Sequence, residues 1–357
     1  MSINGIRTIA RLELKQRARG TRWYVALGLW GAIIAGITVL TYLAQRQSQF
    51  PDGGSTYDVV LFFVLGLGML VMPALTATSI NGDREHGVLA TMQTTLLTAG
   101  DIVIGKLVAA WAIALTFLAI AVPFLLFGYA QRGVDFWGAV RAVIVLAIVL
   151  GAVCALGLMF SSLVARPVAS AVLTYLTTAG LVFLTAIVFI MSFFLVTTKE
   201  DVKVRSIPES FWLDDPTGEK TPTIKDCVVQ TERRDVIHTE RTWWMLAINP
   251  FTVVADASPT RPTSGKMQPE EAFTPLRYIS YGVRLAKSGP PPQPINECYG
   301  YGEPEADPQS MEQVAKTGAV WPYGLIFYIL LGAGSAAVAH RRLRTPIKKL
   351  PSGTRVA

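Results

Sequence analysis

The chain has little charge, few cysteines and few histidines. Of its 357 residues only 16% are charged, whereas a soluble globular protein usually carries about a quarter. Its three cysteines and three histidines are scattered and form no cluster of zinc ligands. The GxxxxGK[ST] sequence is absent, so we expect no ATP to be bound through a P-loop in this chain. With 51% hydrophobic residues, the composition excludes an ordinary soluble domain and predicts a protein that lies in lipid.

No set of catalytic residues stands out either. His86, His238 and His340 lie far apart in the sequence, and Glu85-His86 lacks the HExxH spacing of zinc proteases. Ionisable residues inside membrane spans usually mark proton or ion pathways, but the central thirds of the apolar runs contain none. We therefore expect no catalytic residue, no cofactor-binding residue and no metal ligand, and we expect any transport to draw its energy from a partner.

Six apolar runs are long enough to cross a bilayer, which takes about 20 residues. They are Trp23–Ala44, Val59–Ile80, Ile102–Ala130, Trp137–Val164, Val168–Val196 and Val320–Ala339. The fifth run is long for one crossing, so we expect it to tilt, to bend at Gly180 or to protrude. The first run follows a basic segment and is full length, so it is expected to be a retained anchor rather than a signal peptide.

Charge is distributed unevenly along the chain. Residues 199–319 carry a net charge of −4, and the remainder carries +11. The basic residues gather before the first run, after the sixth, and near the second and fourth loops: Arg7, Arg11, Lys15, Arg17, Arg19, Arg22, Arg84, Lys106, Arg166, Arg341, Arg342, Arg344, Lys348, Lys349 and Arg355. Because short cytoplasmic loops collect Lys and Arg, we expect both termini to be cytoplasmic and residues 199–319 to be extracytoplasmic.

The basic ends flank membrane runs directly and lack interleaved aromatic residues. This pattern favours attraction to anionic membrane lipid over binding of nucleic acid.

The segment 199–319 is rich in loop signals, including DDPTGEKTPT, SPTRPTSG and SGPPPQP. The alternating piece TIKDCVVQ predicts a strand. The piece WWMLAINPF at 243–251 suits either the membrane interface or a small core of the outer segment, and both interpretations stay open. Cys227 and Cys298 lie on the oxidising side, so a disulfide between them is expected, whereas Cys154 is expected to be a packing residue inside the fourth run.

The stretch NGDREHGVLATMQTTLLTAGDIVIGKL at 81–107 lies between two membrane runs. Apolar residues at Val88/Leu89, Met92 and Leu96 predict one face of a helix. The other face is polar but uncharged, whereas a helix lying in lipid headgroups usually carries Lys and Arg there. The pattern therefore favours a cytoplasmic helix that docks to another protein, followed by a helix that Asp101 caps.

These residues resemble a family. The pattern E-x-G-[TV]-L, then Leu-Leu-Thr, then Gly-Lys resembles the region between the second and third helices of ABC-2-type ABC transporter permeases. The matching residues are Glu85, Gly87, Val88, Leu89, Leu96, Leu97, Thr98, Gly105 and Lys106. The segment INGIRTIARLELKQRARGTRW resembles the elbow helix of that family. The chain departs from a minimal permease in its long outer segment, and it has Val88 where Thr is common.

The resemblance implies an all-α polytopic membrane protein in the bacterial inner membrane. Its parts would be an amphipathic elbow helix (1–22), five membrane helices with a coupling helix at 83–98 (23–198), a mixed extracytoplasmic domain (199–319), a sixth membrane helix (320–340) and a basic cytoplasmic tail (341–357). Residues of the coupling helix would contact the ATPase: Arg84, Glu85, His86, Gly87, Leu89, Met92 and Leu96.

The same resemblance implies partners and a cargo. Two permease chains, identical or homologous, would bind two separate ABC ATPase subunits, which hold ATP and Mg. Residues on the second and fifth membrane helices would line the substrate pathway at the dimer interface: Met69, Met72, Pro73, Thr174, Tyr175, Thr178 and Phe183. Such a lining suits export of a hydrophobic or amphipathic substrate. Two other classes compete with this prediction: a non-transporting receptor or sensor with an extracytoplasmic ligand-binding domain, and an integral membrane enzyme.

Overall fold

The computed structural model describes residues 2–47, 54–85, 87, 97–131, 135–213, 222–258, 274–298 and 313–344. Within these residues six helical segments are long and apolar enough to cross a membrane. They are Thr21–Gln47, Thr56–Glu85, Ala99–Ala130, Phe136–Leu163, Pro167–Val196 and Trp321–Arg344. Each one overlaps the run expected for it, so the prediction of a mainly α-helical, multi-pass architecture is confirmed.

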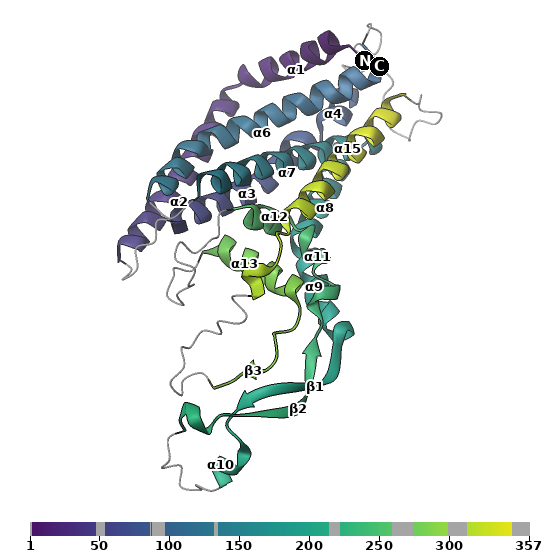
Figure 1. Cartoon of the computed structure of the whole chain (residues 1–357). Helices are drawn as coiled ribbons and strands as arrows, with labels where there is room; N and C mark the ends of the chain where they lie inside the picture. The colour runs from purple at the N-terminus through teal and green to yellow at the C-terminus, as the bar shows by residue number, and fades with distance from the viewer. Residues whose placement is uncertain are drawn as a thin grey trace.

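The helices form an elongated bundle (Figure 1). Its members are α1 (Ile3–Ala18), α2 (Thr21–Gln47), α3 (Gly54–Thr76), α4 (Ser79–Glu85), α6 (Ala99–Ala130), α7 (Phe136–Leu163), α8 (Pro167–Ala179), α9 (Thr185–Val196) and α15 (Trp321–Arg344). At 1.5 Å per residue, the 32 residues of α6 span about 48 Å, which exceeds the roughly 30 Å of a hydrocarbon core. One end of α6 therefore extends beyond the apolar layer.

The centre of the bundle consists of α3, α6 and α7. In the most apolar window of α7, 61% of the residues are buried, against 17% in α2 and 17% in the fifth span. Side chains of α3, α6 and α7 supply most of the main hydrophobic cluster, including Leu65, Phe117 and Leu146. The first and fifth spans thus lie at the periphery and expose most of their apolar surface.

The fifth span is not one regular helix. A π-helical turn, Gly180–Leu184, separates α8 from α9. A π turn inserts one extra residue per turn and marks a local irregularity in a helix. Gly180, where a bend was one of three expectations for this run, is the first residue of this turn.

At one end of the bundle, here called the termini end, α1 runs along the first turns of α6. Gly105 of α6 allows this approach, since a Cβ there would lie 2.8 Å from the Cβ of Ile9. A smaller cluster gathers Ile9, Ile80, Ile102, Leu158 and Leu343 from five helices at this end.

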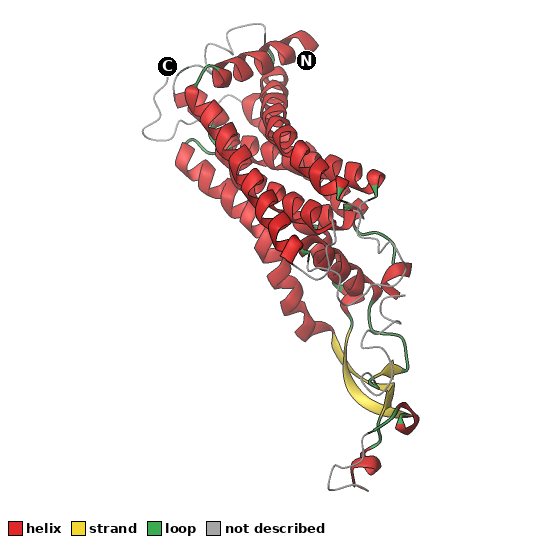
Figure 2. Ribbon diagram, turned by 90° about the vertical axis from the view of Figure 1, so that its left-hand side faces the viewer, coloured by secondary structure: helices red, strands yellow, loops and turns green. Residues whose placement is uncertain are grey.

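At the opposite end, here called the hairpin end, a three-stranded sheet projects from the bundle (Figure 2). Strand β1 (Thr197–Ser206) pairs antiparallel with β2 (Val228–Ile237) and parallel with the short β3 (Ile295–Asn296). The charged run at 199–205 lies in β1, and its charges meet opposite charges on β2, as at Asp201 and Arg233. Only the last part of the expected strand TIKDCVVQ belongs to β2, because Ile224–Asp226 forms a 3₁₀ turn.

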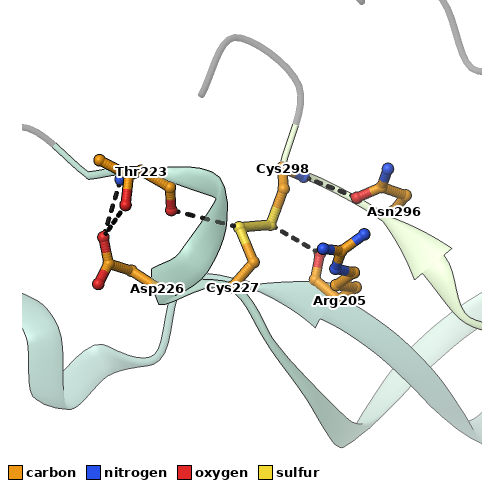
Figure 3. Close-up of a disulfide and its surroundings, with 6 residues drawn as sticks. All are labelled: Arg205, Thr223, Asp226, Cys227, Asn296 and Cys298. Carbon is orange, nitrogen blue, oxygen red and sulfur yellow. Dashed lines mark hydrogen bonds between the residues drawn. A yellow bond between two sulfur atoms is a disulfide. The ribbon is translucent and has the colours of Figure 1, made fainter. Parts of the chain in front are cut away.

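The expected disulfide is present. Cys227 and Cys298, 71 positions apart, are bonded and join the start of β2 to the chain just after β3 (Figure 3). Beside it, Asp226 Oδ2 accepts hydrogen bonds from the amide and the hydroxyl of Thr223. Cys154 is fully buried in α7, which confirms its expected packing role.

The segment between the fifth and sixth spans is not a separate unit. Its helices are α10 (Glu209–Leu213), α11 (Trp244–Ala247), α12 (Pro250–Ala257) and α13 (Pro275–Ser288). Val253, Val254 and Ala257 of α12 belong to the main cluster of the bundle. Within residues 243–251, Trp243 joins a small cluster, Trp244 is exposed, and Phe251 packs on the bundle. The membrane-interface interpretation stays a prediction.

Candidate functional site

The stretch expected to couple the chain to a partner begins where α4 ends. Arg84 and Glu85 are the last residues of α4, and Gly87 has a φ of +73°, with its amide donating to Arg84 O at 3.2 Å. A positive φ is a conformation that glycine adopts readily after a helix C-terminus. A tight turn is thus present at Gly87, and Glu85 is the last residue of a helix, although the coupling helix was expected to run through it from 83 to 98. His86, Leu89, Met92 and Leu96 lie outside the described residues.

A buried ion cluster lies directly beside this turn. The ammonium of Lys106, on α6, is only 1% exposed as a side chain and pairs with Glu13 of α1. It also lies 2.6 Å from Asp83 Oδ2 of α4 and 3.2 Å from Ser79 O. Two carboxylates therefore neutralise one buried cation, and the three charges come from three different helices.

A second polar joint connects the first residues of α1 and α6. Thr98 caps α6, with Asp101 at the third helical position completing a capping box. The other oxygen of Asp101 accepts from the amide of Ser2 at 2.8 Å, and Ser2 in turn caps α1. The sequence predicted Asp101 at this helix start, but the capping residue itself is Thr98.

The break between α3 and α4 is held by side chains of α7, α8 and α1. Ser161 Oγ accepts from the amides of Ile80 and Asn81 at 2.8 and 3.1 Å. Ser170 donates to Ala77 O at 2.5 Å, and Arg17 donates to Leu75 O at 3.0 Å. The backbone groups that a helix break frees are thus satisfied by three other elements.

Charged side chains connect three helices at this point. α4 leads into the stretch expected to couple, and α6 follows it. Lys106 of α6 pairs with Glu13 of α1 and with Asp83 of α4, and Asp101 of α6 accepts from Ser2 before α1. Breaking a buried ion pair by removing one partner costs about 3–5 kcal/mol. Lys106 therefore ties both α1 and α4 to α6.

Sequence reasoning singled out Lys106 but missed its partners. Glu13 and Asp83 are 93 and 23 positions away from Lys106 in the sequence, and no spacing rule joins positions so far apart. The available signal was the position of Lys106 at the margin of a span, where a buried cation requires a nearby carboxylate.

The residues expected to line a pathway divide into two groups. Tyr175 and Phe183 are 37% and 66% exposed on the outer face of the fifth span. In contrast, Met69, Met72, Thr174 and Thr178 are buried within the chain, and so is Pro73. On α3 the exposed residue next to Tyr175 is Leu70. Its carbonyl oxygen accepts a hydrogen bond of 2.9 Å from the Tyr175 hydroxyl.

Among the described residues, no group of three or more His, Cys, Asp or Glu side chains is placed to hold a metal ion. Comparisons with protein families and with curated proteins found no match to this chain.

Proposed function

We propose that this chain is the permease subunit of an ABC-2-type transporter that exports a hydrophobic or amphipathic substrate. ATP and Mg would be bound by a separate ATPase, and a second permease chain would complete the pathway. The termini end would face the cytoplasm of a bacterial cell, in agreement with the excess of Lys and Arg there.

One observation carries this proposal. The Lys106 cluster joins α1, which matches the expected elbow helix, to α4, which leads into the expected coupling stretch at 83–98, and to α6, which follows that stretch. A cation buried between helices is costly unless it is paired, and among the described residues the partners of Lys106 are two carboxylates and Ser79. In a permease that is moved by a separate ATPase, such a pairing would keep the three helices together during the conformational change.

The direct test is reconstitution. The chain would be co-expressed with an ABC ATPase encoded beside its gene, purified as a complex and placed in nanodiscs. We expect a complex with two copies of each chain, whose ATP hydrolysis is stimulated several-fold by an amphipathic substrate. A chain that forms no complex with any ABC ATPase of its genome, or one that leaves ATP hydrolysis unchanged, would favour the receptor or sensor function instead.

Gly87 allows a sharper test of coupling. Because its φ is +73°, Gly87→Leu forces a β-carbon into a conformation that L-residues avoid, whereas Gly87→Asn tolerates it. We expect Gly87→Leu to reduce substrate-stimulated ATP hydrolysis at least five-fold and Gly87→Asn to retain most of it. Gly82→Ala is the matched control, since a Cβ at Gly82 meets no atom within 4 Å. Equal activity in Gly87→Leu and wild type would count against the coupling assignment.

The pathway can be tested by crosslinking. We expect Tyr175→Cys and Phe183→Cys to form disulfides between two chains, because both side chains face outward on the fifth span. Met69→Cys is the buried control and should remain unlinked. If neither exposed position links two chains in native membranes, the fifth span does not form the dimer interface.

A further inference from the structure

The π turn of the fifth span is contacted by one polar side chain from outside the span. Asn249 Nδ2 donates to Val182 O at 2.7 Å and to Thr185 Oγ1 at 2.9 Å. Asn249 is 6% exposed. Within the turn the amide of Thr185 bonds to Gly180 O, five residues back, and the Thr185 hydroxyl donates to Leu181 O. The irregular part of the helix is thus stabilised by an external donor.

The same side chain also begins α12. Asn249 Oδ1 accepts from the amide of Phe251 at 2.9 Å, which makes Asn249 the N-cap of α12. α12 is fixed in the bundle, since its residues 252–257 are all buried and the Phe251 ring packs on Phe62 of α3 at 5.0 Å. One amide group therefore connects the irregular turn of the fifth span to the rigid core.

Above the turn, α9 continues into the hairpin without a linker. α9 ends at Val196 and β1 begins at Thr197, and Val196 O accepts from the amide of His238 at the end of β2. Below the turn, α8 is held by Ser170. A Cβ at Gly180 would meet no described atom within 4 Å apart from its own stretch of helix, so the space beside the start of the turn is open.

We propose that Gly180–Leu184 is a hinge of the fifth span and that Asn249 is the positioning residue that locks it. When the Asn249 amide is bound, α9 and the hairpin are held against the core; when it is released, they swing about the π turn. This inference concerns a motion of the single chain, so it can fail or hold whether or not the chain is a transporter.

The expected amplitude follows from geometry. The 12 residues of α9 form a lever about 18 Å long. A bend of about 20°, the size of kinks found at π-bulges, would move its far end by about 6 Å. Contacts of Trp243 with Tyr323 on α15 remain at the base of the hairpin and set an upper limit to the swing.

The test uses spin labels on the purified full-length chain in nanodiscs. Phe194→Cys on α9 and Trp137→Cys on α7 place the labels at side chains that are 81% and 74% exposed. The native cysteines do not react, because Cys154 is fully buried and the other two form a disulfide. In the otherwise wild-type chain we expect one narrow distance distribution between the labels.

Asn249→Ser separates the two roles of the residue. Serine still caps a helix, but it is too short to reach Val182 O and carries no amide donor. We expect the distance distribution to broaden by about 6 Å, as the lever estimate gives. Adding Gly180→Ala should narrow it again, since alanine restricts the backbone and fits the open space. Ser258→Ala is the matched control at the other end of α12, where Ser258 bonds to Asp58 and not to the turn.

The outcomes are distinct. An unchanged narrow distribution in folded Asn249→Ser, equal to that of Ser258→Ala, overturns the hinge. Broadening that Gly180→Ala does not reverse overturns the location of the hinge at the π turn. If Asn249→Ser does not fold, Thr185→Val removes only one bond to Asn249. An intermediate broadening in Thr185→Val supports the lock, and none contradicts it.

Discussion

The two ends of the bundle use charge differently. At the termini end, Lys106, Glu13 and Asp83 come from three helices and meet inside the packing. At the hairpin end, Asp256 is fully buried on α12, and it binds the first amides of α15 and the guanidinium of Arg284. Beyond it the hairpin relies on partly exposed pairs such as Arg234 with Glu297. Buried charges thus link helices at both ends of the bundle, whereas the sheet beyond the hairpin end is held by charges that are partly exposed.

This difference predicts how each end responds to damage. Loss of an interhelical ion pair should loosen the whole bundle, because it leaves buried charges that nothing else neutralises. Loss of a link in the hairpin should destabilise only the hairpin, because the sheet has few contacts with the spans. The following experiments, ordered by expected effect, test that contrast.

The largest effect is expected from Lys106→Met. Removal of the cation leaves the carboxylates of Glu13 and Asp83 without their partner, at a cost of about 3–5 kcal/mol. We expect a fall of several degrees in the midpoint of thermal unfolding of the detergent-solubilised chain. Arg11→Met, at an exposed position of α1, is the control and should leave the midpoint unchanged. A stable Lys106→Met variant would mean that the termini end is not locked by charge.

The disulfide should matter almost as much, but only at the hairpin end. Closing a loop of 71 residues contributes about 4 kcal/mol in the chain-entropy model. With Cys227→Ser and Cys298→Ser together, we expect the hairpin to be digested at least ten-fold faster by protease in right-side-out vesicles, while the six spans survive. Cys154→Ser, in α7, serves as the comparison. Equal digestion with and without the bond would show that other contacts order the hairpin.

A smaller effect is expected where α1 meets α6. A Cβ at Gly105 lies too close to Ile9, so Gly105→Val should separate the two helices at a cost of about 2 kcal/mol. Gly36→Val, in α2, is the matched control because its Cβ position is open. The thermal midpoint should fall in the first variant only. Similar midpoints in both variants would show that α1 is not packed tightly on α6.

The smallest effect concerns pH at the base of the hairpin. Hydrogen bonds to Glu240 and then Glu200 raise the pKa of His238 above its ordinary value of 6.5. The stability that the protonated His238 gives to the folded hairpin is therefore fully present below pH 6.5 and is lost as the pH rises through the raised pKa. Hydrogen exchange between about pH 5.5 and 8.5, corrected for intrinsic rates, should show declining protection of β1 and β2. His238→Gln should abolish this trend, and a decline that persists in that variant would assign it to another group.

The sequence predicted some features of the two ends and not others. The six spans follow from run length, and the disulfide was anticipated correctly, while the π turn begins at Gly180, where a bend was one of three expectations. The spans depend on local composition, and the disulfide could be assigned because only two cysteines lie in the outer segment. The Lys106 cluster was missed because its partners are distant in the sequence. They lie in other helices, and the periodicity of apolar residues does not specify how those helices are rotated relative to one another.

The segment between the last two spans was predicted less well. A small outer core around residues 243–251 was one of the two open interpretations, but Trp244 is more than half exposed. The apolar residues of α12 instead complete the core of the bundle. The eight residues of α12 are too few for hydropathy to identify a helix buried in the bundle. The strand β1 was not recognised because its sequence is a charged run, several of whose charges are paired with opposite charges on β2.

The bonds of Asp256 have a consequence for biosynthesis. Its carboxylate accepts from the amides of Val320 and Trp321, which open the last helix of the chain. A Cβ at Gly324 would overlap Val253 and the carbonyl of Ala247, so this helix also fits closely against α11 and α12. Asp256 is synthesised some 65 positions before Trp321. The carboxylate that binds the start of the last span is therefore already part of the chain when that span is made, and its two hydrogen bonds favour one register for the first turn of the helix.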